Sequence, residues 1–476
     1  MKKTFFMILA FLLVGETALQ AKVTLPSVIS DNMVLQQRTE AAIWGVADCG
    51  REVTVSTGWD NASYSTKADA KTGKWLLRVK TPVAGGPYSI TVSDGEAVTL
   101  NNVLIGEVWF CSGQSNMEMP VKGYGSQPAI GGMAAILNAK PSRRIRMCNI
   151  DQSSSLKPLE TSVGSWGEHT PGNVADIIAT AYFFADALEK AIDVPVGILV
   201  SCWGGSSIET WLSRDVIEKK FPEFDLAFLD GKAEVKINNQ DPCLLFNGQV
   251  NPLIPYTFKG MIWYQGETNR SRPEQYIRLQ TEYVNMMREI FSVPEAPFYF
   301  VQIAPFPYGN PDSFESGYFI EAQARTLQTI PHSGMAVTCD VGEAGTIHPC
   351  HKQEVGQRLA YLALNHDYGF NSIAADAPSY KEAEFKDGAA VITFNVDELG
   401  ISPMGVDLPG FEIAGTDKVF KPAKARFAGG NKVTVSSEDV PAPVAVRYCF
   451  RNMCKGALYN NFGIPAAPFR TDDWDL

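Results

Sequence analysis

The stretch Glu107-Val-Trp-Phe-Cys-Ser-Gly-Gln-Ser-Asn-Met-Glu118 carries an apolar run into a glycine and then a serine. The run, from Val103 to Cys111, has the length and character of a buried strand. Gly113 permits a tight turn at its end, so Ser115 is expected just beyond the strand, exposed, with its backbone N–H directed into the same site. A nucleophilic serine needs this placement. A serine that only caps a helix is nevertheless the commoner explanation of such a pattern taken alone.

A second apolar run, Val196 to Cys202, ends shortly before the paired glycines Gly204 and Gly205. Because glycine has no side chain to obstruct a ligand, its backbone N–H can approach a substrate oxygen closely. Gly205 is therefore a candidate oxyanion donor, and a plain tight turn is an equally good explanation of the same residues.

A third run, Lys259 to Gln265, continues into Gln265-Gly-Glu-Thr-Asn269. The side-chain amides of Gln265 and Asn269 could donate to an oxyanion, and Glu267 could orient a neighbour. Gln114, beside the serine, joins them as a candidate substrate-binding residue. Taken alone, this segment is a weak signal.

The usual base for a serine nucleophile is a neutral imidazole, and the chain has five histidines. His348 follows the last apolar run, Gly334 to Asp340, by a short loop, which places it at the same sheet edge as Ser115. Its neighbours Cys350 and His351 could suggest zinc, but no second ligand cluster at metal spacing accompanies them. We therefore expect no metal and no cofactor. The four successive strand ends together indicate a serine hydrolase.

The chain of 476 residues is too long for one ordinary domain. Residues 1–21 have the features of a secretory signal peptide, and residues 22–100 contain short strand-like segments typical of a small β-sandwich. Residues 101–372 alternate strands with helices, expected over Asn173–Lys190, Pro273–Phe291 and Phe319–Thr329, and residues 373–476 return to β character. The alternation predicts an α/β fold with a parallel sheet covered on both faces.

The net charge of −11 argues against nucleic acid or an anionic membrane as the main partner. After residues 1–21 there is no second long apolar segment, so we expect a secreted or periplasmic protein without membrane insertion. The sequence does not indicate an oligomeric state.

The segments that carry these candidates resemble the sialate O-acetylesterase family of SGNH hydrolases. The resemblance rests on Gly-Gln-Ser-Asn-Met at 113–117, on Trp-Gly-Gly-Ser-Ser-Ile-Glu-Thr-Trp at 203–211, on Gln-Gly-Glu-Thr-Asn at 265–269 and on Ile347-His348-Pro349 followed by Lys352-Gln353. Residues 31–36 and 468–472 extend it to both ends of the chain after the leader.

The resemblance implies a flavodoxin-like parallel sheet flanked by β-rich, sandwich-like regions, and a reaction without metal or cofactor. It implies Ser115 as nucleophile and His348 as base. The backbone N–H groups of Ser115 and Gly205 and an amide of the third segment would hold the oxyanion. The substrate would be an acetylated carbohydrate, and 9-O-acetyl sialic acid and plant polysaccharides such as xylan are not distinguished.

The chain departs from the family where an orienting acid is often found, three residues before the histidine. That position is Gly345, and Thr346 follows it. Asp340 or Glu343 could orient His348, or a backbone carbonyl could do so and leave a Ser–His dyad. The alternative to an enzyme is a glycan-binding protein built on an inactive hydrolase core.

Overall fold

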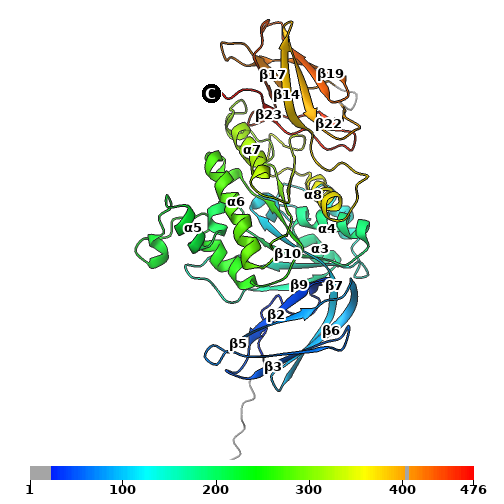
Figure 1. Cartoon of the computed structure of the whole chain (residues 1–476), viewed down its shortest axis with the longest axis vertical. Coiled ribbons are helices and arrows are strands. Elements are labelled where there is room, and N and C mark those ends of the chain that lie inside the picture. Colours follow the sequence, from blue (N-terminus) through cyan, green and yellow to red (C-terminus); the bar gives the residue numbers. More distant parts are fainter. Residues whose placement is uncertain (1–22, 403–406, 476) are drawn as a thin grey trace, which may run out of the picture.

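The computed structural model describes residues 23–402 and 407–475. The expected signal segment, residues 1–21, lies outside the described residues. An N-terminal β module, a central α/β region and a C-terminal β region follow one another along the long axis of the molecule (Figure 1). Within the described residues, no helix has the length and apolarity needed to cross a membrane.

The central sheet confirms the expected α/β class. Its strand order is β13-β12-β11-β7-β10-β8-β9, and all pairs are parallel except β8 with β9. The strands are β7 (Ala97–Gly113), β8 (Ile145–Ile150), β9 (Gly164–Glu168), β10 (Val196–Cys202), β11 (Gly260–Tyr264), β12 (Phe298–Val301) and β13 (Ser333–Ala336). The layered architecture is as expected, and β10 lies between β7 and β8. The chain fills the sheet on both sides of β7, so β7 lies at a topological switch point, where such folds bind ligands.

Helices cover both faces of this sheet because side chains alternate along each strand. Trp109 and Cys111 of β7 pack with the helices of one face, while Val108 and Phe110 pack with those of the other. The first face carries α4 (Ala179–Ile192) and α8 (Lys352–Asp367), and the second carries α6 (Pro273–Ile290) and α7 (Glu315–Arg325). Shorter helices are α2 (Gly132–Leu137), α3 (Pro171–Asp176) and α5 (Arg214–Lys220).

The expected helix over Asn173–Lys190 is wrong in its beginning. The chain forms α3 and then α4, and the N-cap of α3 is Thr170, whose side chain accepts from the backbone N–H of Asn173. Ile177 and Ile178 have extended backbone and separate the two helices. An apolar period alone does not reveal such a break, because both helices continue the same buried stripe.

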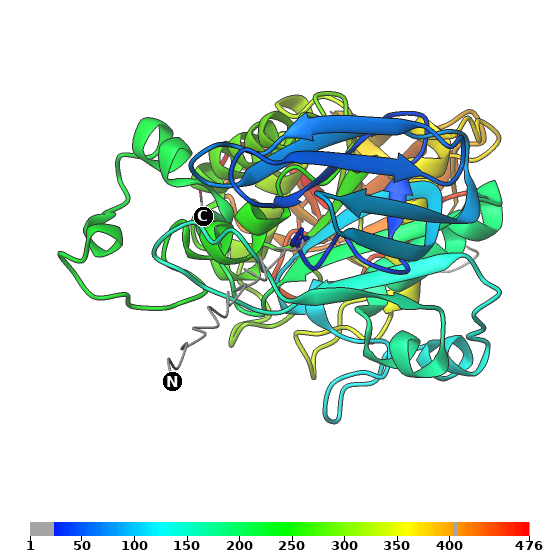
Figure 2. The ribbon, with the colours of Figure 1, turned by 90° about the horizontal axis from the view of Figure 1, so that it is seen from below.

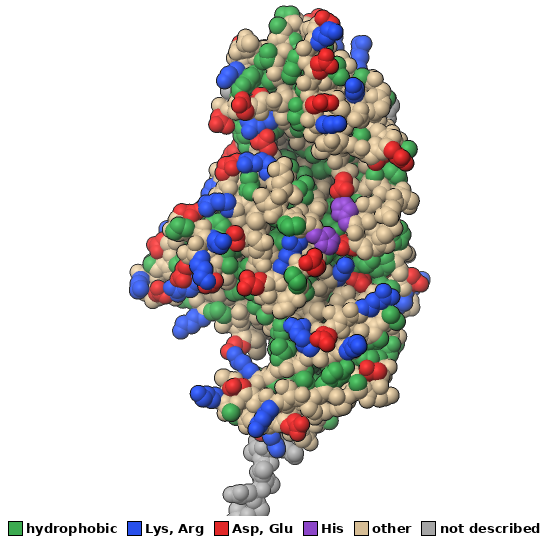
Figure 3. Space-filling model, viewed as in Figure 1, with side chains coloured by type: hydrophobic (Ala, Val, Ile, Leu, Met, Phe, Trp, Pro, Cys, Tyr) green, Lys and Arg blue, Asp and Glu red, His purple; other side chains and the backbone are tan. Residues whose placement is uncertain are grey.

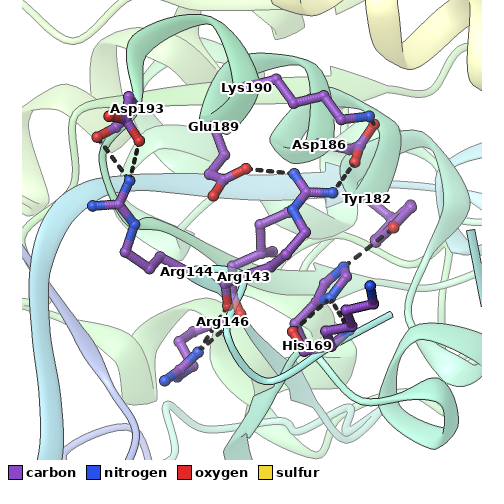
Figure 4. A network of polar contacts seen from close by, with 11 residues as sticks. Arg143, Arg144, Arg146, His169, Tyr182, Asp186, Glu189, Lys190 and Asp193 are labelled. Carbon is purple, nitrogen blue, oxygen red and sulfur yellow. Dashed lines mark hydrogen bonds and ion pairs between the residues drawn. The ribbon is translucent and has the colours of Figure 1, made fainter. Parts of the chain in front are cut away.

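An arginine fastens α4 to the segment before β8 (Figure 4). The guanidinium of Arg143 pairs with Asp186, at 2.6 Å, and with Glu189, both on α4. Beside it, the ring of His169 lies 3.2 Å from the hydroxyl of Tyr182 on the same helix. Arg143 lies just before β8, so these contacts hold α4 to the sheet near the amino end of that strand, away from the carboxyl ends of the strands.

The N-terminal module and the central region share β7. The first part of β7 pairs antiparallel with β6, and the part from Glu107 onward pairs with β10 and β11. The expected boundary at residue 100 therefore lies inside one continuous strand. The other strands, which Figure 2 shows in front, are β1 (Val34–Gln36), β2 (Glu40–Val46), β3 (Glu52–Thr57), β4 (Ser63–Lys67), β5 (Lys74–Lys80) and β6 (Gly85–Ser93).

The C-terminal region has its own apolar core, in which Phe394, Phe411, Tyr448 and Phe469 meet. Two four-stranded sheets, β14-β15-β20-β19 and β18-β17-β21-β23, contribute to it, and β16 pairs with β22. The strands are β14 (Ser379–Lys386), β15 (Ala389–Asn395), β16 (Ile401–Ser402), β17 (Phe411–Ala414), β18 (Lys421–Pro422), β19 (Lys424–Gly429), β20 (Lys432–Ser436), β21 (Ala445–Tyr448), β22 (Tyr459–Asn460) and β23 (Phe469–Arg470).

Candidate active site

Three strand ends are aligned at the centre of the sheet. In the register of β10, β7 and β11, Cys202 pairs with Gly113, and Gly113 pairs with Tyr264. The segments that follow these residues carry the first three groups of candidates. The sheet therefore brings them to one edge, at the carboxyl ends of parallel strands, as the sequence predicts.

The turn that carries Ser115 depends on the glycine at the end of β7. Gly113 has a φ of +146°, and a Cβ at this position would lie 2.2 Å from the carbonyl oxygen of Tyr264. A side chain here would drive β7 and β11 apart. The helix α1 (Ser115–Glu118) begins two residues later, and Ser115, its first residue, is partly exposed.

The glycine turn after β10 lies against the serine. A Cβ on Gly204 would be 3.3 Å from Cβ of Ser115. The N–H of Gly204 is already used, because it donates to Oε2 of Glu118. Within residues 23–402 and 407–475, the N–H groups of Ser115 and Gly205 have no hydrogen-bond acceptor. These are the two backbone donors that the sequence analysis assigns to the oxyanion.

Gly205 is held by its carbonyl group. Nε2 of Gln240 donates to the Gly205 carbonyl oxygen at 3.0 Å, and Oγ1 of Thr268 donates to it at 3.2 Å. Nδ2 of Asn239 likewise donates to the carbonyl oxygen of Gly204 at 2.6 Å. Fixing the carbonyl groups fixes the peptide planes, so the free N–H of Gly205 is oriented before any ligand arrives.

The amides of the third segment have other partners. Nε2 of Gln265 donates to the carbonyl oxygen of Ser206, at 3.1 Å, and to Oδ1 of Asn269, at 2.7 Å. Nδ2 of Asn269 donates to Oε2 of Glu209 at 2.8 Å, and both amide side chains are fully buried. In this geometry the two amides stabilise the glycine turn from the protein interior and do not face a ligand.

Gln114 joins the first and third segments. Its Oε1 accepts from the backbone N–H of Gly266 at 3.1 Å, and its own N–H donates to the carbonyl oxygen of Tyr264 at 3.0 Å. Since its side chain is buried, Gln114 positions the turn before Ser115 and does not line an open site.

His348 lies in the loop before α8, as predicted, and its partner is an amide. Nδ1 of His348 is 2.8 Å from Oε1 of Gln127. Tyr124, in the same turn as Gln127, sets its ring edge against the imidazole at 5.4 Å between centroids, and its hydroxyl donates to the backbone carbonyl of Ser115 at 3.3 Å. Burial, and then the charge of Lys352, lower the pKa of His348 below its ordinary value, which favours the neutral imidazole that a base requires.

The two candidate acids contact other groups. Asp340 forms a two-pronged ion pair with Arg358, with oxygen–nitrogen distances of 2.8 and 2.6 Å. Oε1 of Glu343 accepts from the N–H of Cys350 at 3.0 Å and from its thiol at 2.6 Å. In the described part of the chain, the side-chain partner of Nδ1 of His348 is Oε1 of Gln127, so an amide oxygen and neither candidate acid orients the imidazole.

A buried polar chain joins the serine turn to the histidine loop. Nδ2 of Asn116 donates to Oε1 of Glu267, at 2.6 Å, and to the carbonyl oxygen of Ile347, at 3.1 Å. Nζ of Lys352 donates to Oδ1 of Asn116 at 2.5 Å. Burial lowers the pKa of Lys352 to about 7 and raises the pKa of Glu267. Glu267 thus orients a neighbour, as proposed from the sequence, and that neighbour is Asn116.

Sequence reasoning assigns no role to Asn116, Lys352, Glu118, Tyr124 or Gln127. Asn116 and Lys352 stand inside quoted motifs, beside the serine and four residues after the histidine, so their positions were a usable signal. Gln127 and Tyr124 lie in the loop between α1 and α2, without any period or motif, and only the folded chain brings them to His348.

A cavity of about 370 Å³ adjoins the serine turn. Its lining combines the polar side chains of Glu118, Asn149, Asp151 and Gln152 with apolar ones such as Ile150, and Tyr124 forms part of its wall. Nε2 of Gln152 donates to Oε1 of Glu118 at 3.0 Å, so the side of the cavity next to the glycine turn is a set of hydrogen-bonding groups. On the face of the molecule in Figure 3, acidic and basic side chains are interspersed and do not form a patch of one sign.

Known proteins are similar to this chain in sequence and in fold. The family model described as carbohydrate esterase, sialic acid-specific acetylesterase matches residues 105–365. The sialate O-acetylesterase of Mus musculus is 26% identical over 93% of each chain, and that of Homo sapiens is 26% identical over 75% of this chain and 73% of its own. A carbohydrate acetylesterase from Xanthomonas citri, known from its crystal structure, is 35% identical with a TM-score of 0.85, covering 95% of this chain and all of the other.

Proposed function

Because the chain belongs to the sialic acid-specific acetylesterase family of carbohydrate esterases, we propose that Ser115 and His348 remove O-acetyl groups from sugar hydroxyls through an acetyl-serine intermediate. Family membership makes the protein a carboxylic ester hydrolase of the carbohydrate acetylesterase class. One observation carries the proposal further: Ser115 lies against a glycine turn, and its own N–H and that of Gly205 have no acceptor in the described chain.

In the proposed first half-reaction, Nε2 of His348 takes the proton of Oγ of Ser115 while Oγ attacks the acetyl carbonyl carbon. The N–H groups of Ser115 and Gly205 donate to the oxyanion that forms, a contribution that often exceeds any other single one in acyl transfer. The tetrahedral intermediate collapses, the sugar oxygen leaves with the proton from His348, and the acetyl group remains on Oγ. Water, activated by the same imidazole, then releases acetate.

Gln127 takes the orienting role that an acid has in a full triad. Its Oε1 accepts a hydrogen bond from the N–H at Nδ1, and in this tautomer Nε2 of His348 is unprotonated and can act as a base. An amide stabilises an imidazolium less than a carboxylate does. Among the described residues no carboxylate contacts the imidazole, and burial together with the charge of Lys352 lowers the pKa of His348.

The polar cavity supports a hydroxylated leaving group. Glu118, Asn149 and Gln152 offer acceptors and donors that match the hydroxyls of a sugar. We propose 9-O-acetyl sialic acid or an acetylated plant polysaccharide such as xylan as substrate, encountered outside the cytoplasm after residues 1–21 are removed.

The test is acetate release by the full-length mature chain from acetylated sialic acid, xylan and pectin, with Ser115→Ala as control. We expect release from at least one of these sugars by the wild type and none above background by Ser115→Ala. A folded wild-type sample that releases no acetate, while both forms bind the sugar equally, would instead support a glycan-binding protein on an inactive core.

A further inference from the structure

Three metal-binding side chains meet beside the histidine loop. One ligand atom each of Glu343, Cys350 and His351 lies within 4.8 Å of the other two. Cys350 and His351 precede α8 directly, and Glu343 reaches them from the other end of the loop. His348 is not part of this group, and its Nδ1 contacts Gln127 instead.

We propose that Glu343, Cys350 and His351 form a binding site for a thiophilic divalent cation, with Zn²⁺ as the fitting metal. A thiolate, an imidazole and a carboxylate are the ligands that Zn²⁺ takes in proteins, and three protein ligands leave one position for water. Ligand atoms around tetrahedral zinc are about 3.5 Å apart, so side-chain rotations that move the ligand atoms by about 1 Å suffice to close the site.

Glu354 adds the contact that metal-binding histidines usually make. Its Oε1 lies 3.0 Å from Nδ1 of His351, one turn along α8, and a carboxylate in this position fixes the ring orientation. Its other oxygen, Oε2, is buried and has no partner within the described ranges. A cation at His351 would give this carboxylate a nearby positive charge.

Binding involves one exchange of a proton and no redox change. The thiol of Cys350 now donates to Oε1 of Glu343 at 2.6 Å. The cation takes the place of that proton, a metal–sulfur bond forms, and the proton passes to solvent.

The site would fasten both ends of the loop that carries His348. Glu343 and Thr346 already form an isolated bridge, and the carbonyl of Ile347 is bound by Asn116. A cation that joins Glu343 to Cys350 and His351 closes this loop with a second clamp. We therefore assign it a structural role, in which it stabilises the loop and takes no part in ester hydrolysis.

Co²⁺ is the direct probe, since a cobalt–thiolate bond absorbs in the near ultraviolet. The full chain is stripped with a chelator and titrated with Co²⁺, then with Zn²⁺ by calorimetry. We expect one Co²⁺ per chain, a sulfur-to-cobalt band, displacement by Zn²⁺ and a rise in Tm. Cys350→Ser should abolish the band, and His351→Asn should weaken binding about 100-fold.

Cys454→Ser is the matched control. It removes a thiol outside the proposed site, one whose sulfur atom lies 2.8 Å from that of Cys449. This variant should keep the band. Glu343→Gln, which retains the thiol, should weaken binding while its circular dichroism stays unchanged. The proposal is overturned if the wild type shows no band, or if Cys350→Ser binds Co²⁺ as the wild type does. Neither readout depends on esterase activity, so the proposed function and the metal site fail independently.

Discussion

Nδ2 of Asn116 lies 3.1 Å from the backbone carbonyl oxygen of Ile347, and this hydrogen bond joins the serine turn to the histidine loop. Asn116 directly follows Ser115 in the sequence, and Ile347 directly precedes His348. Because Lys352 and Glu267 hold the same amide, one buried side chain links Ser115 to His348, in addition to the contacts that Tyr124 makes with both.

Asn116→Ala should lower kcat/KM by about 100-fold, since displacement of a reacting group by about an ångström has an effect of this size. It leaves Lys352, Glu267 and Ile347 without their shared partner, so the free energy of unfolding should also fall by about 1–3 kcal/mol. Kinetics at a temperature where the variant is fully folded separate the two effects. Wild-type kcat/KM in a folded Asn116→Ala sample would show that the link does not position the base.

Gln127→Ala should reduce kcat by about 10–100-fold and change KM little, because it removes the group that orients His348 without removing the base. Gln127→Glu should retain more activity than Gln127→Ala, since a carboxylate can also accept from Nδ1. Steady-state kinetics on one acetylated substrate compare the three proteins. If Gln127→Ala has the wild-type kcat, another group orients the imidazole.

Asp340→Asn and Glu343→Gln should separate structural from catalytic roles of the two acids. Asp340→Asn leaves the buried guanidinium of Arg358 without its ion-pair partner, which should destabilise the fold by about 3–5 kcal/mol. Both variants should keep kcat near the wild-type value when folded. Thermal unfolding and kcat are measured together, and a loss of kcat above about 1,000-fold with an unchanged Tm in either variant would identify a triad acid.

The pH dependence follows from the sign of the shift at His348. The proposed base, His348, must be neutral, and its pKa lies below the ordinary value of about 6.5. We therefore expect kcat/KM to be constant around neutral pH and to fall only below about pH 6.5. Lys352→Met removes a positive charge that disfavours the imidazolium, and the acid limb should therefore move to higher pH. The profiles are recorded with chelator present. An acid limb that stays in place or moves to lower pH in Lys352→Met would show that Lys352 does not act on His348 electrostatically.

The residues that the sequence places correctly are those fixed by the course of the backbone. Gly113, Gly204 and Gly205 mark turns at strand ends, and parallel strands bring such ends to one edge, so Ser115 and its N–H partners could be placed without side-chain information. His348 follows the last strand by a short loop and is located by the same rule.

The partners of these residues could not be placed in this way. Gln127 reaches His348 across more than two hundred residues, and Asp340 turns to Arg358 because a buried guanidinium offers a stronger partner than an imidazole. Gln265 and Asn269 look like oxyanion donors in the sequence, yet burial beneath the glycine turn directs both inward. A Cys/His pattern identifies only Cys350 and His351 of the proposed metal site, because Glu343 is not a residue that such a pattern includes.

The central claim is that acetyl transfer passes through Oγ of Ser115. The most direct measurement is rapid acid quenching of the mature enzyme with an acetylated sugar, followed by intact mass analysis and peptide mapping. The account predicts a transient gain of one acetyl group on the peptide that contains Ser115, absent from Ser115→Ala. Turnover of the sugar with the acetyl group on another residue, or undiminished turnover by Ser115→Ala, would contradict it.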